Sequence, residues 1–223
     1  MEKPVYKKLN VNEIFYSIQG EGSRAGLPCV FVRLQGCNLR CGWCDTPYAL
    51  ELRETAEIMT FEQIIEKVDS YNCSFVLFTG GEPLAQPDCI PLMKHLCGLG
   101  FTVALETNGN MDLSEIDERI VKIVDIKCPG SKMSKFMNYK NIEFLTKRDE
   151  VKFVIGDRDD YDFAVTTAEK YNLYDKCAEV LFSPVFGSIY LKELAEWMLE
   201  DKLKARMQIQ LHKFIWGPNV RGV

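Results

Sequence analysis

Short apolar runs alternate with segments of helical periodicity from about residue 28 to the end of the chain, and this alternation restricts the fold more than any other feature. Runs of this length that are rich in β-branched residues are typical of buried strands. The expected strands are 29–34, 74–78, 102–106, 123–127, 151–155, 180–183 and 207–212, and the expected helices are 60–68, 89–98, 113–121, 160–171 and 189–203.

The order of strand, helix and next strand predicts a parallel α/β fold, because parallel strands need a long crossover. Such units close into all or part of a barrel whose functional loops follow the carboxyl ends of the strands. An open doubly wound sheet would give a similar pattern. Residues 11–18 add an extended segment that leads into the turn Gln19-Gly20-Glu21-Gly22. We therefore expect one α/β domain over residues 1–223, a partial (β/α)6-type barrel with an N-terminal hairpin.

The composition is that of a globular protein, with 47% hydrophobic and 26% charged residues. No apolar run approaches the roughly 18 residues of a membrane-spanning helix, and the first eight residues lack the apolar stretch of a secretory signal. We expect a soluble, cytoplasmic protein. The net charge of −5 argues against nucleic acid as a partner, and the lysines between Lys127 and Arg148 are interpreted as a solvated face.

The cysteines fall into two groups. Their total of nine is odd and no secretory signal is present, which argues against a disulfide framework. Three of them, Cys37, Cys41 and Cys44, follow the strand expected at 29–34, at the end where barrel enzymes have their active sites. The other six are scattered and are expected to be small apolar residues of the core: Cys29, Cys73, Cys89, Cys97, Cys128 and Cys177.

Three thiolates in an irregular loop can hold one metal centre. In a four-iron cluster they leave one iron without a protein ligand, and an amino acid can chelate that iron through its amino and carboxylate groups. The alternative is a zinc ion bound by the same cysteines together with His95 or His212. Zinc sites usually contain two spaced pairs of ligands, so the spacing favours the iron-sulfur cluster.

Polar or glycine-rich segments follow four later strands. Thr79-Gly80-Gly81-Glu82-Pro83 and Glu106-Thr107-Asn108-Gly109 contain glycines that let the backbone approach a ligand closely. Asp125-Ile126-Lys127 and Ser183-Pro184-Val185-Phe186 lie at later strand ends. Taken singly, such segments are ordinary turns. Together with the cysteines, they predict a single site at the mouth of the barrel.

The cysteine spacing followed by Thr79-Gly80-Gly81-Glu82-Pro83 resembles the motifs of the radical S-adenosylmethionine superfamily. The resemblance implies a 4Fe-4S cluster on Cys37, Cys41 and Cys44 and reductive cleavage of S-adenosylmethionine. It also implies cofactor contacts from Trp43, Cys44, Asp45, Gly81, Glu82, Asn108, Asp125, Ile126, Lys127, Ser183, Pro184, Val185 and Phe186.

Within this superfamily, the chain is similar to the 7-carboxy-7-deazaguanine synthase family over nearly its whole length. The similarity rests on residues 13–22, Arg33, Cys44-Asp45-Thr46 and His212-Lys213. These lyases convert 6-carboxy-5,6,7,8-tetrahydropterin into 7-carboxy-7-deazaguanine with loss of ammonia, a step towards the tRNA nucleoside queuosine. Membership implies a Mg²⁺ ion on Thr46 and substrate contacts from Ile18, Gln19, Gly20, Glu21, Arg33, Thr79, Glu106 and His212.

The resemblance further implies a homodimer and a flavodoxin- or ferredoxin-type electron donor. Two alternatives stay open: an activating enzyme for a glycyl-radical protein, which shares the cysteine spacing, and a non-catalytic zinc or iron-sulfur binding module. The turn at residues 19–22 and Arg33 favour the enzyme with a small-molecule substrate. Some relatives end soon after the His-Lys pair, whereas this chain continues to Val223, so the sequence does not assign a role to residues 218–223.

Overall fold

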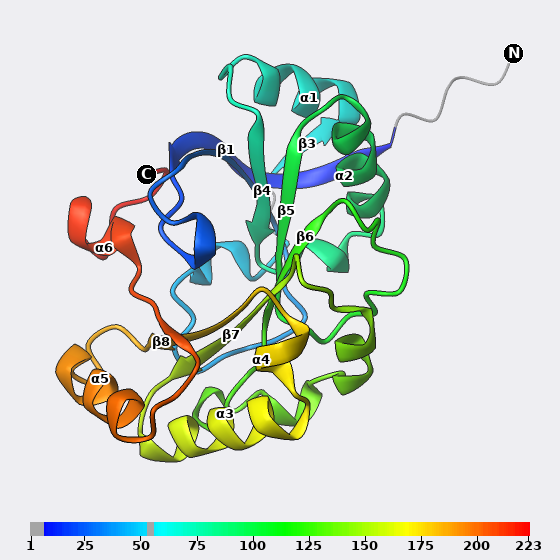
Figure 1. Ribbon diagram of the computed structural model, residues 1–223. Coiled ribbons are helices and arrows are strands. Elements are labelled where there is room, and N and C mark those ends of the chain that lie inside the picture. Colours follow the sequence, from blue (N-terminus) through cyan, green and yellow to red (C-terminus); the bar gives the residue numbers. More distant parts are fainter. Residues whose placement is uncertain (1–6, 53–55) are drawn as a thin grey trace, which may run out of the picture.

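A computed structural model describes residues 7–52 and 56–223, which form one open sheet with helices packed along it (Figure 1). The strand order is β3-β1-β2-β4-β5-β6-β7-β8-β9. Neighbouring strands from β2 to β9 are parallel, as expected for strands joined by crossovers. The sheet therefore agrees with the expected partial barrel. Residues 1–6, which include most of the segment considered as a signal, lie outside the described residues.

Seven parallel strands occur in the regions expected from the sequence. Their bounds are β2 (Pro28–Leu34), β4 (Phe75–Gly80), β5 (Thr102–Thr107), β6 (Val121–Asp125), β7 (Glu150–Ile155), β8 (Glu179–Pro184) and β9 (Arg206–Met207). Strand β6 begins and ends two residues earlier than expected. Because β6 ends at Asp125, the segment 126–127 belongs to the loop after the strand and not to the strand itself.

Strand β9 is much shorter than the strand expected at 207–212, and that prediction is wrong beyond Met207. The amide of Gln208 still donates to the Phe182 carbonyl (2.9 Å), but the chain then leaves the sheet. The amide of Leu211 donates instead to the carbonyl of Gly20 (3.1 Å), and helix α6 (Leu211–Ile215) begins there. The C-terminal segment is thereby drawn towards the turn after β1.

Four of the five expected helices are present, and a short fifth one, α4, follows α3. Their bounds are α1 (Phe61–Asp69), α2 (Cys89–Gly98), α3 (Arg158–Lys170), α4 (Leu173–Lys176) and α5 (Leu191–Glu200). The start of α1 shows why the sequence predicts it well. Thr60 and Gln63 form a capping box in which each side chain accepts a hydrogen bond from the backbone N–H of the other residue.

The helix expected at 113–121 does not form, so that prediction is wrong. The Asp112 carboxylate accepts a hydrogen bond from Ser114 N (3.0 Å), and the Asp117 carboxylate accepts one from Arg119 N (3.1 Å). Local bonds of this kind hold the backbone in turns and compete with a helix. The connection from β6 to β7 also lacks an α-helix and contains three 3-10 turns: η4 (Pro129–Ser131), η5 (Ser134–Phe136) and η6 (Tyr139–Phe144).

The predicted N-terminal hairpin is confirmed. Strand β1 (Lys8–Ile18) pairs antiparallel with β2, with Ile18 opposite Pro28. Its other edge pairs with β3 (Glu57–Thr60), and the turn between β1 and β2 contains the short η1 (Gly22–Arg24). Gln19 N donates to Leu27 O and Gly26 N donates to Gln19 O, both at 2.8 Å. These bonds give the turn at residues 19–27 a fixed shape.

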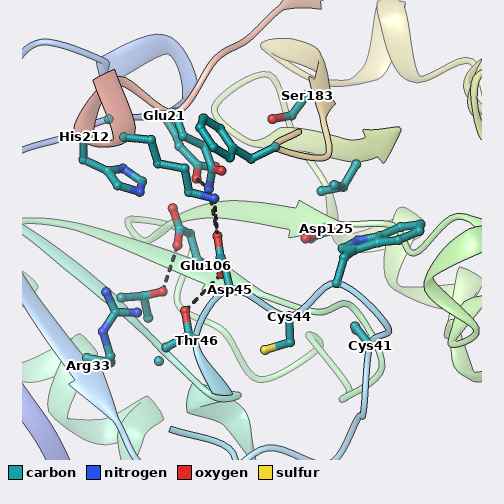
Figure 2. Close-up of a pocket in the computed structure, with 18 of the residues that line it drawn as sticks. Glu21, Arg33, Cys41, Cys44, Asp45, Thr46, Glu106, Asp125, Ser183 and His212 are labelled. Atoms are coloured by element: carbon teal, nitrogen blue, oxygen red, sulfur yellow. Dashed lines mark hydrogen bonds and ion pairs between the residues drawn. The ribbon is translucent and has the colours of Figure 1, made fainter. Parts of the chain in front are cut away.

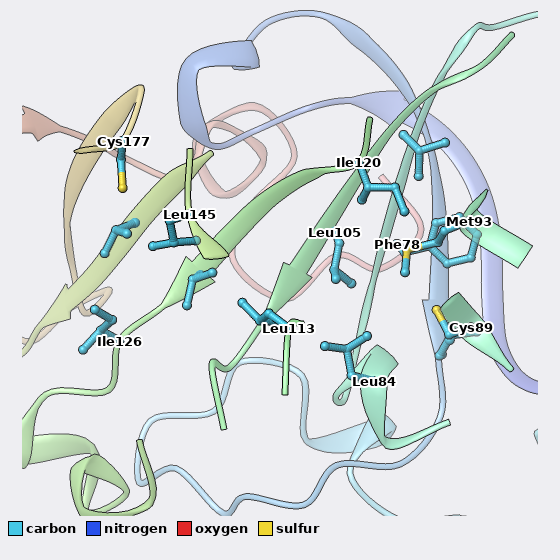
Figure 3. Close-up of a cluster of buried hydrophobic side chains, with 14 of the residues drawn as sticks. Phe78, Leu84, Cys89, Met93, Leu105, Leu113, Ile120, Ile126, Leu145 and Cys177 are labelled. Carbon is cyan, nitrogen blue, oxygen red and sulfur yellow. The ribbon is translucent and has the colours of Figure 1, made fainter. Parts of the chain in front are cut away.

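The main core lies between the sheet and the helices, where Phe78, Leu105 and Met93 are fully buried (Figure 3). The six scattered cysteines belong to core clusters as expected: Cys29, Cys89, Cys128 and Cys177 are buried, and Cys73 and Cys97 pack against the core while partly exposed. Among the described residues, no helix is both long and apolar enough to cross a membrane.

Candidate active site

A cavity of about 760 Å³ opens at the carboxyl ends of the parallel strands. Its wall contains residues that follow β2, β4, β5, β6 and β8, together with the turn after β1 and the C-terminal segment (Figure 2). Because parallel strands end at the same edge of a sheet, motifs that are far apart in the sequence meet here.

The three clustered cysteines all line this cavity from the irregular loop after β2. Burial raises the pKa of all three thiols, Cys37, Cys41 and Cys44. The Asn108 amide donates to Cys37 Sγ (3.9 Å), and the Lys127 ammonium opposes the rise in the pKa of Cys41. Thiols with N–H donors and a cation close by fit an iron-sulfur cluster, whose binding deprotonates its ligands.

The zinc alternative fits the geometry less well. His95, one of the two histidines considered for zinc, is exposed on α2 and is not part of the cavity wall, whereas His212 is. The donor set at the cysteines therefore favours the cluster.

At Gly80 and Gly81, the end of β4 and the turn after it pack backbone against backbone on the end of β2 and on the loop that contains Cys37, Cys41 and Cys44. We call this loop the cysteine loop. An added Cβ at Gly80, which has φ of 138°, would lie 2.2 Å from the Leu34 carbonyl oxygen. At Gly81 it would lie 2.1 Å from the Gly36 carbonyl oxygen. The Gly81 N–H donates to Leu34 O (3.1 Å) and the Glu82 N–H to Gly36 O (2.8 Å). Only glycine permits this approach.

Two residues predicted to contact the cofactor, Glu82 and Ile126, are not part of the cavity wall. Glu82 is fully buried, and its carboxylate accepts hydrogen bonds from Thr107 Oγ1 (2.9 Å), Asn108 N (2.7 Å) and Leu84 N (3.1 Å). Burial raises the pKa of Glu82 despite these donors. Ile126 belongs to the hydrophobic core. The cofactor contacts predicted for these two residues stay predictions. In the structure, Glu82 joins the ends of β4 and β5 behind the cavity.

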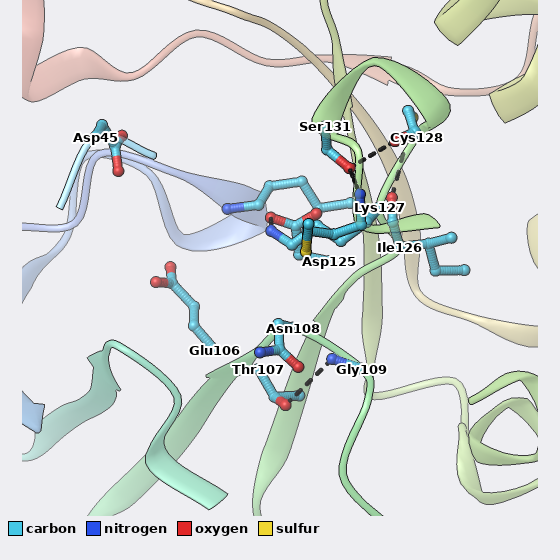
Figure 4. A network of polar contacts seen from close by, with 12 residues as sticks. Asp45, Glu106, Thr107, Asn108, Gly109, Asp125, Ile126, Lys127, Cys128 and Ser131 are labelled. Atoms are coloured by element: carbon cyan, nitrogen blue, oxygen red, sulfur yellow. Dashed lines mark hydrogen bonds and ion pairs between the residues drawn. The ribbon is translucent and has the colours of Figure 1, made fainter. Parts of the chain in front are cut away.

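The ends of β5 and β6 present a polar group on the cysteine side of the cavity (Figure 4). Lys127 Nζ pairs with Asp125 Oδ2 at 2.7 Å. Burial alone would lower the pKa of Lys127, but Asp125 outweighs it and the net shift is upward, so the ammonium is charged. Asp125 Oδ1 is buried and has no hydrogen-bond partner among the described residues. The Asn108 amide donates to Asn38 Oδ1 (2.8 Å) and so is anchored beside the cysteine loop.

A second polar group lies at the ends of β2, β4 and β5. The Thr79 hydroxyl donates to Glu106 Oε2 (2.8 Å), and burial raises the pKa of Glu106. Arg33 Nε donates to Glu13 Oε1 (2.8 Å), and its guanidinium lies over the Tyr48 ring at 5.9 Å from the centroid. Neither terminal nitrogen of Arg33 makes a hydrogen bond within the described part of the chain. The guanidinium therefore keeps donors available for a ligand.

The turn after β1 supplies a third group. Gln19 is buried, and its Nε2 has no hydrogen-bond partner among the described residues. The Glu21 carboxylate is already occupied, because it pairs with Lys152 Nζ (2.7 Å) and accepts hydrogen bonds from Gln208 (3.0 Å). His212 packs against Gly20 so closely that an added Cβ there would lie 2.8 Å from His212 Nδ1. Burial lowers the pKa of His212, which keeps the imidazole neutral near pH 7.

The C-terminal segment connects this turn to the cysteine loop. The Gln210 side-chain amide donates to Glu21 Oε1 (2.7 Å) and to Asp45 Oδ2 (3.0 Å), and Lys213 Nζ lies 3.2 Å from the same Asp45 oxygen. Burial alone would raise the pKa of Asp45, but Lys213 and Gln210 outweigh it and hold that pKa below its usual range. The Thr46 hydroxyl donates to Asp45 Oδ1 (3.1 Å).

All other predicted site residues line the cavity. They include Ser183 and Pro184 at the end of β8 and Val185 and Phe186 after it, where Phe186 meets the Phe214 ring edge-to-face. Sequence reasoning missed Lys152, Gln210 and Tyr48 and left residues 218–223 unassigned, although all of them line the cavity. Lys152 had a visible signal, because it interrupts the otherwise apolar run 151–155 between two buried residues. Gln210 and Tyr48 are polar loop residues with no distinguishing pattern.

Comparisons with known proteins agree with this geometry. The Radical SAM superfamily model matches residues 31–172. The 7-carboxy-7-deazaguanine synthase of Koribacter versatilis is 40% identical over 96% of this chain and 100% of its own length. That of Chlorobaculum tepidum is 43% identical over 96% of this chain and 97% of its own. The crystal structure of QueE from Escherichia coli, at 23% identity, covers 91% of this chain and 94% of that one with a TM-score of 0.75, which shows the same fold.

The match over nearly the full length of both relatives favours the small-molecule enzyme over the activating-enzyme and non-catalytic alternatives. Radical SAM enzymes use a 4Fe-4S cluster and S-adenosylmethionine and require a reductant. The chain belongs to the Radical SAM superfamily and, within it, to the 7-carboxy-7-deazaguanine synthase family.

Proposed function

We propose that this chain, as one radical SAM domain over residues 1–223, converts 6-carboxy-5,6,7,8-tetrahydropterin into 7-carboxy-7-deazaguanine. The observation that carries the proposal is one cavity that joins three cysteines to buried polar atoms with no hydrogen-bond partner among the described residues. When bound, the cluster and S-adenosylmethionine supply the radical that removes a hydrogen atom from the substrate. The protein's own residues have to bind both molecules, orient them and exclude water.

The cofactor end is the side of the cavity formed by Cys37, Cys41 and Cys44, which would hold the cluster. The backbone carbonyl of Gly81 lies in the same cavity and can accept from the amino group of S-adenosylmethionine. Asp125 Oδ1, which has no partner among the described residues, can accept from a hydroxyl group of the same ligand. The remaining contacts proposed for this ligand are Trp43, Cys44, Asp45, Asn108, Lys127 and residues 183–186.

The substrate end is formed by the other two polar groups. The Gln19 amide and the Arg33 guanidinium have free donors that suit the pterin carbonyl and carboxylate. The raised pKa of Glu106 favours its protonated form, and the carboxyl group can then donate as well as accept a hydrogen bond at the pterin edge. Ile18, Gly20, Glu21, Thr79 and His212 complete the proposed contacts.

The metal and partner proposals come from the family resemblance. We propose that the Thr46 hydroxyl, near the mouth beside Asp45, takes part in binding Mg²⁺ together with the substrate carboxylate. A flavodoxin- or ferredoxin-type protein is the proposed reductant, and a homodimer is the proposed assembly. A cytoplasmic location is proposed because the cluster needs a reducing compartment.

The decisive experiment is anaerobic incubation of the reconstituted protein with dithionite, S-adenosylmethionine, Mg²⁺ and the carboxypterin, followed by mass analysis. We expect 7-carboxy-7-deazaguanine and released ammonia. Arg33→Ala should raise KM for the pterin at least tenfold while 5'-deoxyadenosine still forms slowly without substrate, since Arg33 lies at the substrate end. Formation of 5'-deoxyadenosine with no deazapurine from the unmodified protein would reject the substrate and keep the superfamily assignment.

A further inference from the structure

Trp43, between two of the cluster cysteines, is held in a slot formed by two glycines from distant parts of the chain. Gly130 lies in η4, and Gly156 follows β7. An added Cβ at Gly130 would lie 2.8 Å from two atoms of the Trp43 ring, and one at Gly156 would lie 3.2 Å from Trp43 Cζ3. Neither glycine is among those with positive φ, so neighbouring side chains and not backbone strain exclude a larger residue here.

Asp160 closes this slot from behind. It lies in the first turn of α3 and is fully buried. Its Oδ1 accepts a hydrogen bond from Gly130 N (2.8 Å), and its Oδ2 accepts one from Gly156 N (3.0 Å). Its own N–H donates to Asp157 Oδ1 (2.9 Å), which caps α3 and fixes the backbone of this turn. A single carboxylate therefore joins the two loops that form the walls of the slot.

A second contact holds the same part of the cysteine loop. The Gly42 N–H donates to the carbonyl of Ser131 (3.1 Å), and Ser131 is fully buried. The cysteine loop is thus attached to the η4 turn at two consecutive residues, through the backbone of Gly42 and through the ring of Trp43. Because Cys41 and Cys44 flank these two residues, any movement of the slot is passed to both thiols.

We propose that Asp160 is a positioning residue for the cysteine loop: by holding Gly130 and Gly156 together it fixes Trp43, and with it Cys41 and Cys44. The proposal rests on the proposed function only because these thiols are taken as cluster ligands. Both hydrogen bonds need an acceptor oxygen. An asparagine offers one oxygen and turns an N–H group towards the other donor, so Asp160→Asn removes one of the two bonds without a change in size.

The test is the rate at which N-ethylmaleimide labels each cysteine in the metal-free, reduced protein, followed by peptide mass spectrometry. In Asp160→Asn, we expect Cys41 and Cys44 to be labelled at least threefold faster than in the unmodified protein. Cys97 on α2 is partly exposed and distant in the fold, and it should keep its rate. Asp159→Asn is the matched control, because Asp159 lies in the same turn and is exposed.

A second variant keeps the proposal testable if Asp160→Asn does not fold. Gly156→Ala places a methyl group 3.1 Å from Asp160 Oδ2 and 3.2 Å from Trp43 Cζ3, and it should accelerate labelling of the same two cysteines. Phenylalanine lacks that ring atom, so Trp43→Phe combined with Gly156→Ala should bring the rates closer to those of Trp43→Phe alone, while the contact with Asp160 remains. This rescue separates a steric effect in the slot from a general loss of stability.

Two results would overturn the proposal. One is a folded Asp160→Asn protein with a lower melting temperature but unchanged labelling of Cys41 and Cys44, which would make Asp160 merely a structural part of α3. The other is equal acceleration at Cys97, which would indicate general loosening. Because the assay uses protein without cluster or substrate, it stays informative even if no deazapurine is ever detected.

Discussion

At the scale of single residues, Glu82 supports the site without belonging to its surface. Its carboxylate accepts hydrogen bonds from two backbone N–H groups and the Thr107 hydroxyl while fully buried. Glu82→Gln turns an amide N–H group towards one of these donors, so we expect a loss of about 1–3 kcal/mol in the free energy of unfolding. Urea unfolding measures it, with the exposed Glu66→Gln on α1 as the control. Equal stability of the two variants would contradict this role.

Asp45 makes a pH-dependent contribution to stability. The Lys213 ammonium and the Gln210 amide hold its pKa below the value in the unfolded chain, although burial opposes them. A carboxyl group with a lowered pKa stabilises the fold above its unfolded pKa, and the contribution is lost as the pH falls through the acidic range. The difference in unfolding free energy between the unmodified protein and Asp45→Asn should therefore shrink from about pH 7 to about pH 3. A difference that is constant with pH would contradict the prediction.

The sequence predicted the chemistry of the site better than the pairing of its side chains. Cysteine spacing and strand-end motifs identified part of the cavity wall, because each of these signals is local, and the family resemblance added residues 18–21, Arg33, Thr46 and His212. The hydrogen bonds that Glu21 accepts from Lys152, Gln208 and Gln210 come from residues 131, 187 and 189 positions away in the sequence. No local pattern encodes such partners.

At the scale of elements, the segment after α6 forms part of the cavity mouth. The Arg221 guanidinium lies 3.5 Å from the centroid of the Tyr48 ring, and residues 218–223 line the cavity. Exposed cation–π contacts contribute about 0.5–1 kcal/mol, so Arg221→Ala should raise KM for the pterin roughly two- to fivefold with little change in kcat. Steady-state kinetics measures KM and kcat separately, with Lys204→Ala as the control. A fall in kcat at constant KM would point to a different role.

The expected elements failed where the backbone forms other hydrogen bonds, either with nearby side chains or with a distant part of the chain. Residues 113–121 have apolar residues at helical spacing, and Leu113 and Ile120 are indeed buried, but Asp112 and Asp117 hold the chain in turns. The strand expected at 207–212 ends early because the backbone of Leu211 bonds to Gly20. Apolar periodicity reports which residues are buried, and it does not report which backbone conformation buries them.

At the scale of the whole molecule, the parallel order β2-β4-β5-β6-β7-β8 fixes the relative positions of the site groups. The alternation of strands and helices predicted a parallel α/β sheet but did not distinguish this order from that of a doubly wound sheet. The sequence did not show that the crossover from β5 to β6 lacks an α-helix, because turn-forming side chains and a helix can bury the same apolar residues. The open sheet leaves the space beside β1 and β8 to be closed by the C-terminal segment.

Ligand binding should therefore stabilise the fold as one unit. With S-adenosylmethionine at 100 times its dissociation constant, the cluster-loaded protein should gain about 2.7 kcal/mol in unfolding free energy, because only the folded chain has the complete cavity. Anaerobic thermal unfolding with and without the ligand measures the gain. Cys44→Ala should show almost none of it, and an undiminished gain in that variant would place the ligand elsewhere.

The contact between Gly80, Gly81 and the cysteine loop has a consequence for how this chain can vary. Even one methyl group at either position would overlap carbonyl atoms of Leu34 or Gly36, and no side-chain rearrangement can relieve an overlap with backbone. If both codons were fully randomised and active clones selected, the survivors should all encode Gly-Gly. Suppressor mutations elsewhere should not appear, since no distant replacement can make room between two main chains.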